Sequence, residues 1–372
     1  MADHRSLPLT DLSEDEKLFR ALAVPIGEGL CGWVAAKRQP IVNGNPAISY
    51  YDVTNGDLKY VRANNAAGTA WGTPVTIDST GNVGQYTSLA VVNGAPAIGY
   101  YDATNGDLKF VRATNVNGTA WSAPVTVDST GDVGWYASLK VINGNPAISY
   151  YDVSNNSLKY ARAVDASGAT WGMPLTLGTS TGQHSSLAVV AGNPALSYHD
   201  GTFLMYLRAS NADGTSWGTP VTITTIRTPC TPGGPCASFS EFLSTALAVV
   251  NGSPAISFFH LQNKDLMYVR ASDSTGAAWN TPQTLDSTGT VGEYNSLALV
   301  GGNPLISYYD NSGGNLKYIR ASNADGTSWN PPTVVDSPGN VGQYTSLAAV
   351  NGSPAMSYYD VTNGDLKGAW VD

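Results

Sequence analysis

The chain has little charge, little glutamate and few cysteines. Charged residues make up 13% of its 372 residues, about half of the ~25% that is typical of globular proteins, and only five of its 28 acidic residues are glutamates. With 19 Lys and Arg and a net charge of −9, the chain is poorly suited to a phosphate backbone, so nucleic-acid binding is disfavoured. No apolar run approaches the ~18 residues that a membrane span needs.

Signals for cofactors, export and disulfides are equally sparse. The chain has no P-loop, no dinucleotide fingerprint and no GxSxG elbow, so we expect no cofactor and assign no catalytic residue. The opening residues lack the basic region and apolar core of a signal peptide, whereas the low charge and abundant Thr, Ser and Asn are typical of an extracellular surface, so the compartment stays open. Cys230 and Cys236 flank a Pro/Gly-rich segment, where a disulfide or two free thiols fit equally well.

Residues that favour strands and turns are abundant. There are 40 Gly, 21 Pro, 20 Tyr and 9 Trp, and Tyr, Val, Thr, Asn and Gly suit strands and tight turns. Hydrophobic residues make up 42% of the chain, which suffices for a core and argues against disorder. The composition predicts one large all-β body.

An internal repeat specifies the architecture. The motif NGxPAxSYYD occurs seven times, with its proline at positions 46, 96, 146, 194, 254, 304 and 354. In the second unit we expect strands at 88–92, 96–102, 108–113 and 121–127, with Asn-Gly turns that favour hairpins. Four antiparallel strands in a unit of about 50 residues are typical of a propeller blade. The sequence therefore predicts an all-β, seven-bladed β-propeller of four-stranded antiparallel blades.

The ring needs an N-terminal strand, because the seventh unit ends after its third strand. The segment ALAVPIG at 21–27 has the offset of a missing fourth strand, and we expect it to close the ring. A short helix is the alternative, since Ser13 and Glu16 match a capping box. We therefore expect an extension over residues 1–20, frayed or briefly helical, and a monomeric propeller over 21–372 with an insertion near 224–244.

Two segments resemble known families. The SYYD-(V/A)TNGDLKY block and the hairpin SNADGTSW at 210–217 and 322–329 resemble bacterial repeat proteins with sialidase-like (BNR) blades, the hairpin being a relaxed Asp-box. In that family the Asp-box is a structural turn, so the resemblance implies the fold and not catalysis. Residues 27–42, GEGLCGWVAAKRQPIV, resemble the centre of a GAF domain and are interpreted as a fusion remnant or a recruited latch strand.

Aromatic residues and carboxylates are expected on one face of the propeller, where the turns between strands two and three and the connections between blades emerge. Aromatic rings stack on the C–H faces of sugars while polar groups hold the hydroxyls. The candidate ligand-binding residues are Asp52, Tyr86, Asp102, Trp135, Tyr136, Tyr294 and Tyr344. Blade packing is the other explanation for repeated aromatics. The DVTNGD turns lack the alternating ligands of an EF-hand, so no metal is assigned.

Six arginines hold one repeat position, and the seventh unit has Trp370 there. A sialidase-like site needs converging arginines, whereas these are spread around a ring. We therefore expect a structural role, an ion pair or hydrogen bond with the aspartate of SYYD on the neighbouring strand. Unit five has His260 in place of that aspartate but keeps Arg270, so pairing is not the whole account. The six residues are Arg62, Arg112, Arg162, Arg208, Arg270 and Arg320.

Departures from the repeat collect in units four and five. His184, His199 and His260 replace repeat residues, and Glu241 lies in the insertion. On a propeller these four residues approach the same face, and three histidines with a glutamate suit zinc or acid–base chemistry. Drift within a repeat is the competing explanation, because no HExxH spacing is present.

The pattern as a whole favours a non-catalytic, ligand-binding propeller. Carbohydrate is the expected ligand, since repeated shallow sites give avidity. A protein–protein interaction scaffold and a sialidase-like glycan-processing enzyme are the alternatives.

Overall fold

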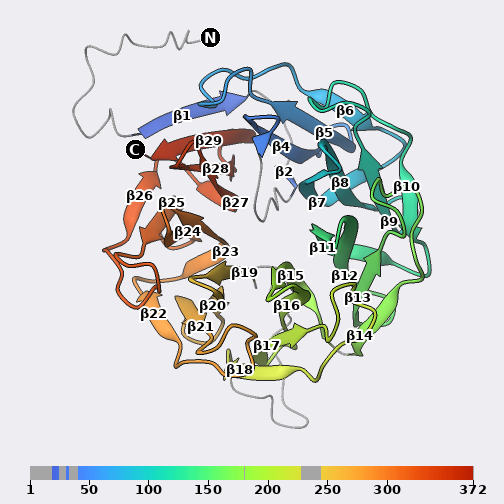
Figure 1. Cartoon of the computed structure of the whole chain (residues 1–372). Coiled ribbons are helices and arrows are strands. Elements are labelled where there is room, and N and C mark those ends of the chain that lie inside the picture. The colour runs from blue at the N-terminus through green and yellow to red at the C-terminus, as the bar shows by residue number, and fades with distance from the viewer. Residues whose placement is uncertain (1–18, 25–30, 33–40, 180, 228–243, 372) are drawn as a thin grey trace, which may run out of the picture.

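The computed structural model describes residues 19–24, 31–32, 41–179, 181–227 and 244–371. Within these ranges every regular element is a β-strand, and the strands form seven antiparallel sheets arranged as blades around a central axis (Figure 1). The predicted seven-bladed, all-β propeller is confirmed. No helix long and apolar enough to cross a membrane occurs among the described residues.

Each blade runs from an inner strand at the axis to an outer strand at the rim (Figure 1). The inner strands of blades 2–7 are β7 (Val83–Val92), β11 (Val133–Ile142), β15 (Gln183–Val190), β19 (Thr245–Val250), β23 (Val291–Val300) and β27 (Val341–Val350). The second strands of blades 1–7 are β4 (Asn45–Asp52), β8 (Ala95–Asp102), β12 (Asn145–Asp152), β16 (Asn193–His199), β20 (Ser253–His260), β24 (Asn303–Asp310) and β28 (Ser353–Asp360). The third strands are β5 (Asp57–Arg62), β9 (Asp107–Arg112), β13 (Ser157–Arg162), β17 (Phe203–Arg208), β21 (Asp265–Arg270), β25 (Asn315–Arg320) and β29 (Asp365–Val371). The outer strands of blades 1–6 are β6 (Val75–Asp78), β10 (Val125–Asp128), β14 (Leu175–Thr179), β18 (Val221–Thr225), β22 (Gln283–Asp286) and β26 (Thr333–Asp336).

An N-terminal strand closes the ring. β1 (Phe19–Val24) is the outer strand of blade 7, with Phe19 opposite Val371 and Val24 opposite Leu366. The next strands, β2 (Cys31–Gly32) and β3 (Ile41–Val42), pair with β4 in blade 1. The predicted latch strand is confirmed over residues 21–24 and begins two residues earlier than expected, whereas residues 25–27 of the prediction lie outside the described residues. The rest of the predicted extension, residues 1–18, lies outside the described residues.

The strand boundaries predicted for the second unit differ most from the structure at the inner and the outer strand of blade 2. In blade 2 the inner strand begins at Val83 rather than at residue 88, because a bulge lets Val83 and Gln85 pair with the end of β8. The outer strand begins only at Val125, and Trp121 contributes an isolated bridge. Pro124 precedes this strand and has no N–H to donate to a ladder.

Neighbouring blades are joined by aromatic pairs and by a glycine. The Tyr60 ring of blade 1 meets Trp121 of blade 2 edge-on, with ring centroids 5.1 Å apart. A Cβ on Gly118 would lie 2.6 Å from the Tyr60 ring, so only glycine fits there. The same aromatic contact recurs as Phe110–Trp171, Tyr160–Trp217, Tyr206–Trp279 and Tyr268–Trp329.

Lysines, not arginines, pair with the aspartate of SYYD. Lys109 Nζ lies 2.6 Å from Asp102 of its own blade and 4.0 Å from Asp78 of the preceding blade. Arg112 instead donates to the carbonyls of Val92 at 2.8 Å and Asn93 at 2.7 Å, in the hairpin between the inner and second strands. The expected Arg–Asp pairing is therefore wrong. Arg112 ends the third strand opposite Ala97, whereas Asp102 ends the second strand opposite Asp107. The two residues therefore lie at opposite ends of the strand pair.

Candidate functional site

A strained aromatic position recurs at the start of the inner strands. One residue there has a positive φ of 51° to 56° in five blades, a conformation that bulky side chains rarely adopt. It lies at the bulge of the inner strand, where the register shifts. Strain held at one repeat position marks a candidate functional site. The five residues are Tyr86, Tyr136, His184, Tyr294 and Tyr344.

Three of the predicted ligand-binding residues come together between blades 2 and 3. Tyr86 stacks on Trp135 with ring centroids 5.2 Å apart and planes 28° apart, and it contacts Tyr136 at 4.8 Å. Tyr101 packs within 6.1 Å of Tyr86 and 5.9 Å of Trp135. With Asp132, these four aromatic residues form what we call the blade 2/3 cluster.

A carboxylate is held at the edge of this cluster. The Oδ1 atom of Asp132 accepts hydrogen bonds from the Tyr101 hydroxyl at 2.7 Å and from Trp135 Nε1 at 3.2 Å. Tyr86, Asp132 and Trp135 are partly exposed, whereas Tyr101 and Tyr136 are buried. The cluster therefore presents an indole and a hydrogen-bond acceptor beside each other at an accessible surface.

Related arrangements recur in other blades. Between blades 1 and 2, Asn82 Oδ1 accepts from the Tyr51 hydroxyl at 2.5 Å and from Gln85 Nε2 at 3.3 Å. Between blades 6 and 7, Asn340 Oδ1 accepts from the Tyr309 hydroxyl at 2.7 Å. An acceptor next to a tyrosine is thus a repeated feature of this face.

The other two predicted tyrosines also meet, beside a buried carboxyl. The rings of Tyr294 and Tyr344 lie 4.3 Å apart. Glu293, which precedes Tyr294, is 3% exposed and accepts a hydrogen bond from Asn311 Nδ2 at 3.0 Å. Burial raises the pKa of the Glu293 carboxyl to about 7, although Asn311 and the charge of Lys264 act in the opposite direction.

The two predicted aspartates are occupied within their blades. Asp52 and Asp102 are buried, and each is bound to the lysine of its own blade, at 2.7 Å from Lys59 and 2.6 Å from Lys109. Both also accept backbone N–H groups of the following turn. Burial by itself raises the pKa of Asp102, but hydrogen bonds from Lys109 and Asn105 hold it below its ordinary value. A ligand contact at Asp52 or Asp102 stays a prediction.

The structure brings together two of the four residues of the predicted asymmetric site. His184 and His199 are buried and stacked, with centroids 5.7 Å apart, and His184 also lies 3.8 Å from the ring of Tyr136. His260 is the last residue of β20 in blade 5, and its Nδ1 accepts the N–H of Asn263 in the following turn at 3.2 Å. Glu241 lies outside the described residues, as do Cys230 and Cys236. The described part of the chain contains no group of three or more His, Cys, Asp or Glu that could hold a metal ion.

Sequence reasoning missed Tyr101, Asp132 and Glu293. A column-by-column comparison of the connections would have found two of them. Asp132 stands where Asn82 and Asn340 stand, and Glu293 stands where other blades have glutamine. Tyr101 carried no distinguishing signal, because every SYYD motif with a second tyrosine offers the same residue.

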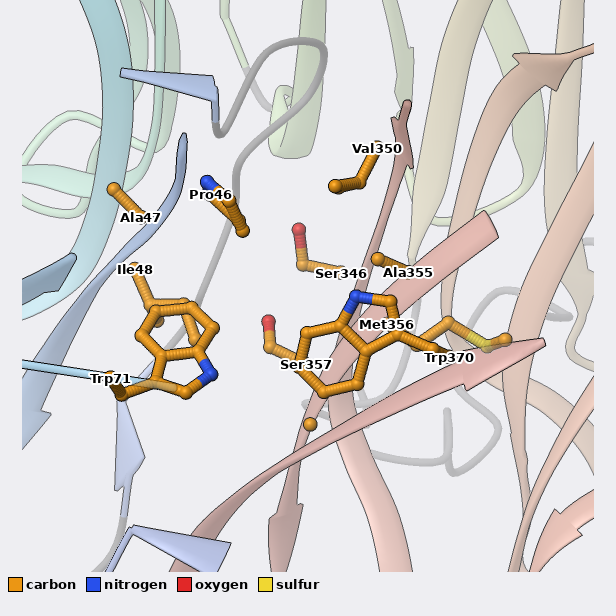
Figure 2. A pocket seen from close by; sticks show the side chains of 11 residues that line it. Pro46, Ala47, Ile48, Trp71, Ser346, Val350, Ala355, Met356, Ser357 and Trp370 are labelled. Carbon is orange, nitrogen blue, oxygen red and sulfur yellow. The ribbon is translucent and has the colours of Figure 1, made fainter. Parts of the chain in front are cut away.

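A small cavity lies where the ring closes, between blades 7 and 1 (Figure 2). The indoles of Trp71 and Trp370 flank it, 6.3 Å apart, and the Ser346 and Ser357 hydroxyls point between them. Its volume of about 30 Å³ has room for water and is far below the space that a sugar ring needs. We therefore treat it as a feature of the seam between the blades and not as a ligand site.

No protein-family model and no curated protein matches the chain. Among solved structures it is similar to the Dos1 propeller, with 11% identity and a TM-score of 0.53 over 89% of this chain and 76% of that one. It is also similar to a fucose-specific lectin from Aleuria aurantia (14% identity, TM-score 0.47, 83% and 97% covered) and to Hadza microbial sialidase Hz136 (13%, 0.48, 89% and 74%). At these identities the likeness concerns the fold alone, a β-propeller.

Proposed function

We propose that the protein is a non-catalytic, carbohydrate-binding propeller that uses the aromatic clusters on one face. The observation that supports this most is the blade 2/3 cluster, in which a partly exposed indole lies beside a fixed carboxylate oxygen. An indole offers its face to sugar C–H groups, and a carboxylate oxygen accepts a hydrogen bond from a sugar hydroxyl. The pair therefore complements both the apolar face and the hydroxyl groups of a sugar ring.

Repetition supports the same proposal. The Tyr51–Asn82 and Tyr309–Asn340 pairs place an acceptor at equivalent points of other blades. Weak sites that face the same way bind a multivalent glycan by avidity. This repetition suits a polymer or a glycan-coated surface better than a single small molecule.

The arrangement of cations weakens the sialidase-like alternative. A sialidase-like site grips a carboxylate with converging arginines, but Arg112 and Arg162 donate to hairpin carbonyls at the opposite end of their strands from the aromatic clusters. A protein-interaction scaffold remains the second proposal. The Asp-box ancestry of the blades, a bacterial origin and the GAF-like segment also remain proposals, to which no family match lends support.

A glycan array with the folded, monodisperse protein tests the proposal. We expect binding to multivalent glycans and loss of that binding in the double variant Tyr86→Ala/Trp135→Ala. The control is Val164→Ala, which truncates an exposed apolar side chain outside the clusters. Absence of glycan binding by the folded wild type would reject the lectin and leave the scaffold.

A further inference from the structure

The blade 2/3 cluster differs from its counterparts at two positions. Where it has Trp135, the described counterparts in blades 2, 4, 6 and 7 have no aromatic ring, and where it has Asp132, the described counterparts in blades 2, 6 and 7 are neutral. The counterparts of Trp135 are Gln85, Gln183, Glu293 and Gln343, and those of Asp132 are Asn82, Thr290 and Asn340. Its stacking surface and its charge are therefore absent from those sites.

The charge at this cluster is negative and is not paired with a cation in the described structure. The Tyr101 hydroxyl and the Trp135 N–H, which donate to Asp132, are both neutral. The nearby lysines are already bound, Lys109 to Asp102 and Lys159 to Asp128 and Asp152.

The remaining cations of blades 2 and 3 lie toward the other face. Arg112 and Arg162 are held by carbonyls of the hairpins there. Lys140 lies five residues further along β11 than Trp135, about 16 Å away at ~3.3 Å per residue. A ligand carboxylate at the cluster would therefore meet repulsion from Asp132, and no lysine or arginine of blades 2 and 3 is placed to compensate it.

We infer that the blade 2/3 cluster is the principal carbohydrate site and that it takes a neutral pyranose. This inference rests on the proposed function and specifies its ligand class. The C–H face of the sugar packs on the Trp135 indole, and a ring hydroxyl donates to the Asp132 carboxylate. The charge of Asp132 disfavours anionic sugars such as sialic or uronic acids.

Two substitutions convert this cluster into its neighbours and so test the inference. Trp135→Gln and Asp132→Asn introduce the residues that blade 7 has, as Gln343 and Asn340, and both are compatible with the blade fold. Gln343→Ala is the matched control, because it changes the position equivalent to Trp135 in another blade.

The measurement is isothermal titration with methyl glycosides of galactose, glucose, mannose and fucose, and with N-acetylneuraminic and glucuronic acids. We expect at least one neutral glycoside to bind, both acids to bind at least about tenfold more weakly, and Trp135→Gln to weaken neutral binding by about tenfold or more. Asp132→Asn should weaken neutral binding and reduce the discrimination against the acids, whereas Gln343→Ala should leave wild-type affinity within about twofold.

The outcomes separate this inference from the proposed function. Wild-type protein that binds no glycan, either here or on the array, rejects the proposed function itself. Wild-type protein that binds sugar, but keeps its affinity in Trp135→Gln, rejects only the assignment of the principal site. Tighter binding of either acid than of every neutral glycoside rejects the ligand class.

Discussion

Glu293 places a titratable carboxyl at a repeat position where other blades have an uncharged glutamine. Blades 2 and 7 have Gln85 and Gln343 at this position, and a protonated carboxyl has nearly the shape of an amide. Because burial raises the pKa of Glu293 to about 7, the side chain resembles its glutamine counterparts in acid and carries a buried charge in base.

This difference predicts how stability depends on pH. The folded-state pKa of about 7 lies above the ordinary value of 4.5, so the folded state holds its proton more tightly and loses stability as the pH rises from about 4.5 to 7. Glu293→Gln should match the wild type at pH 4 and exceed its free energy of unfolding by about 3 kcal/mol at pH 8. Urea denaturation at pH 4, 6 and 8 measures both.

The matched control is Gln343→Glu, which places a carboxyl at the partly exposed equivalent position of blade 7. Its stability should change less with pH than that of the wild-type Glu293 site, because water solvates the charge there. A constant difference between Glu293→Gln and the wild type at all three pH values would contradict the explanation.

Among the elements, β29 departs most from the repeat. At the positions where β5 has Tyr60 and Arg62, β29 has Gly368 and Trp370. A Cβ on Gly68 would lie 2.6 Å from the Trp370 ring, as one on Gly118 would from Tyr60. Trp370 therefore supplies the ring that packs on the next blade, two residues later than usual. The exchange leaves the cavity of Figure 2, and the buried Trp370 Nε1 has no hydrogen-bond partner in the described structure.

Substitutions at this seam should separate the role of the ring from that of the strand. Trp370→Ala should lower the free energy of unfolding by about 3 kcal/mol or more, because it removes the only ring that fills the seam from β29. The double variant Gly368→Tyr/Trp370→Arg restores the pair found in β5 and should recover most of that loss. Chemical denaturation measures both variants, and a double variant less stable than Trp370→Ala would show that the seam does not follow the geometry of the other blades.

The sequence predicted elements better than contacts. Asn-Gly turns and the SYYD motif located the strands, because hairpin chemistry is local. The sequence does not predict the first residues of β7 as a strand, because only their pairing with β8 makes them one. Gly84 and Tyr86 have positive φ there, which departs from regular strand geometry. Arginine and lysine both suited the aspartate of SYYD, and only the three-dimensional register assigned the lysine.

In the candidate site, too, the residues are easier to predict from the sequence than their contacts. The repeat predicts Tyr86, Trp135 and Tyr136 as aromatic residues on one face, and in the structure they are in contact. The part played by Asp132 depends on a hydrogen bond from Tyr101, 31 residues away in the chain, and no local pattern announces such a contact.

At the scale of the whole molecule, β1 determines whether blade 7 has an outer strand. Deleting residues 1–24 removes β1 and exposes the edge of β29, which then offers unpaired backbone groups. We expect the melting temperature to fall by roughly 5 °C or more and the protein to self-associate. Differential scanning calorimetry and light scattering measure these effects.

Deleting only residues 1–18 is the control, because that variant keeps β1. Its melting temperature and its elution volume should be closer to those of the full chain than the values of the longer deletion are. Equal behaviour of the two deletions would show that β1 contributes nothing to closure.

The pairing of β1 with β29 also sets an order in time. At about 5–20 residues per second, a ribosome needs about 20–70 s to make the roughly 350 residues between Phe19 and Val371. Throughout that interval β1 has no native partner, while the blades between can already fold as local hairpins. The first strand among the described residues is thus among the last to reach its place, and the nascent protein must keep it from pairing elsewhere until blade 7 emerges.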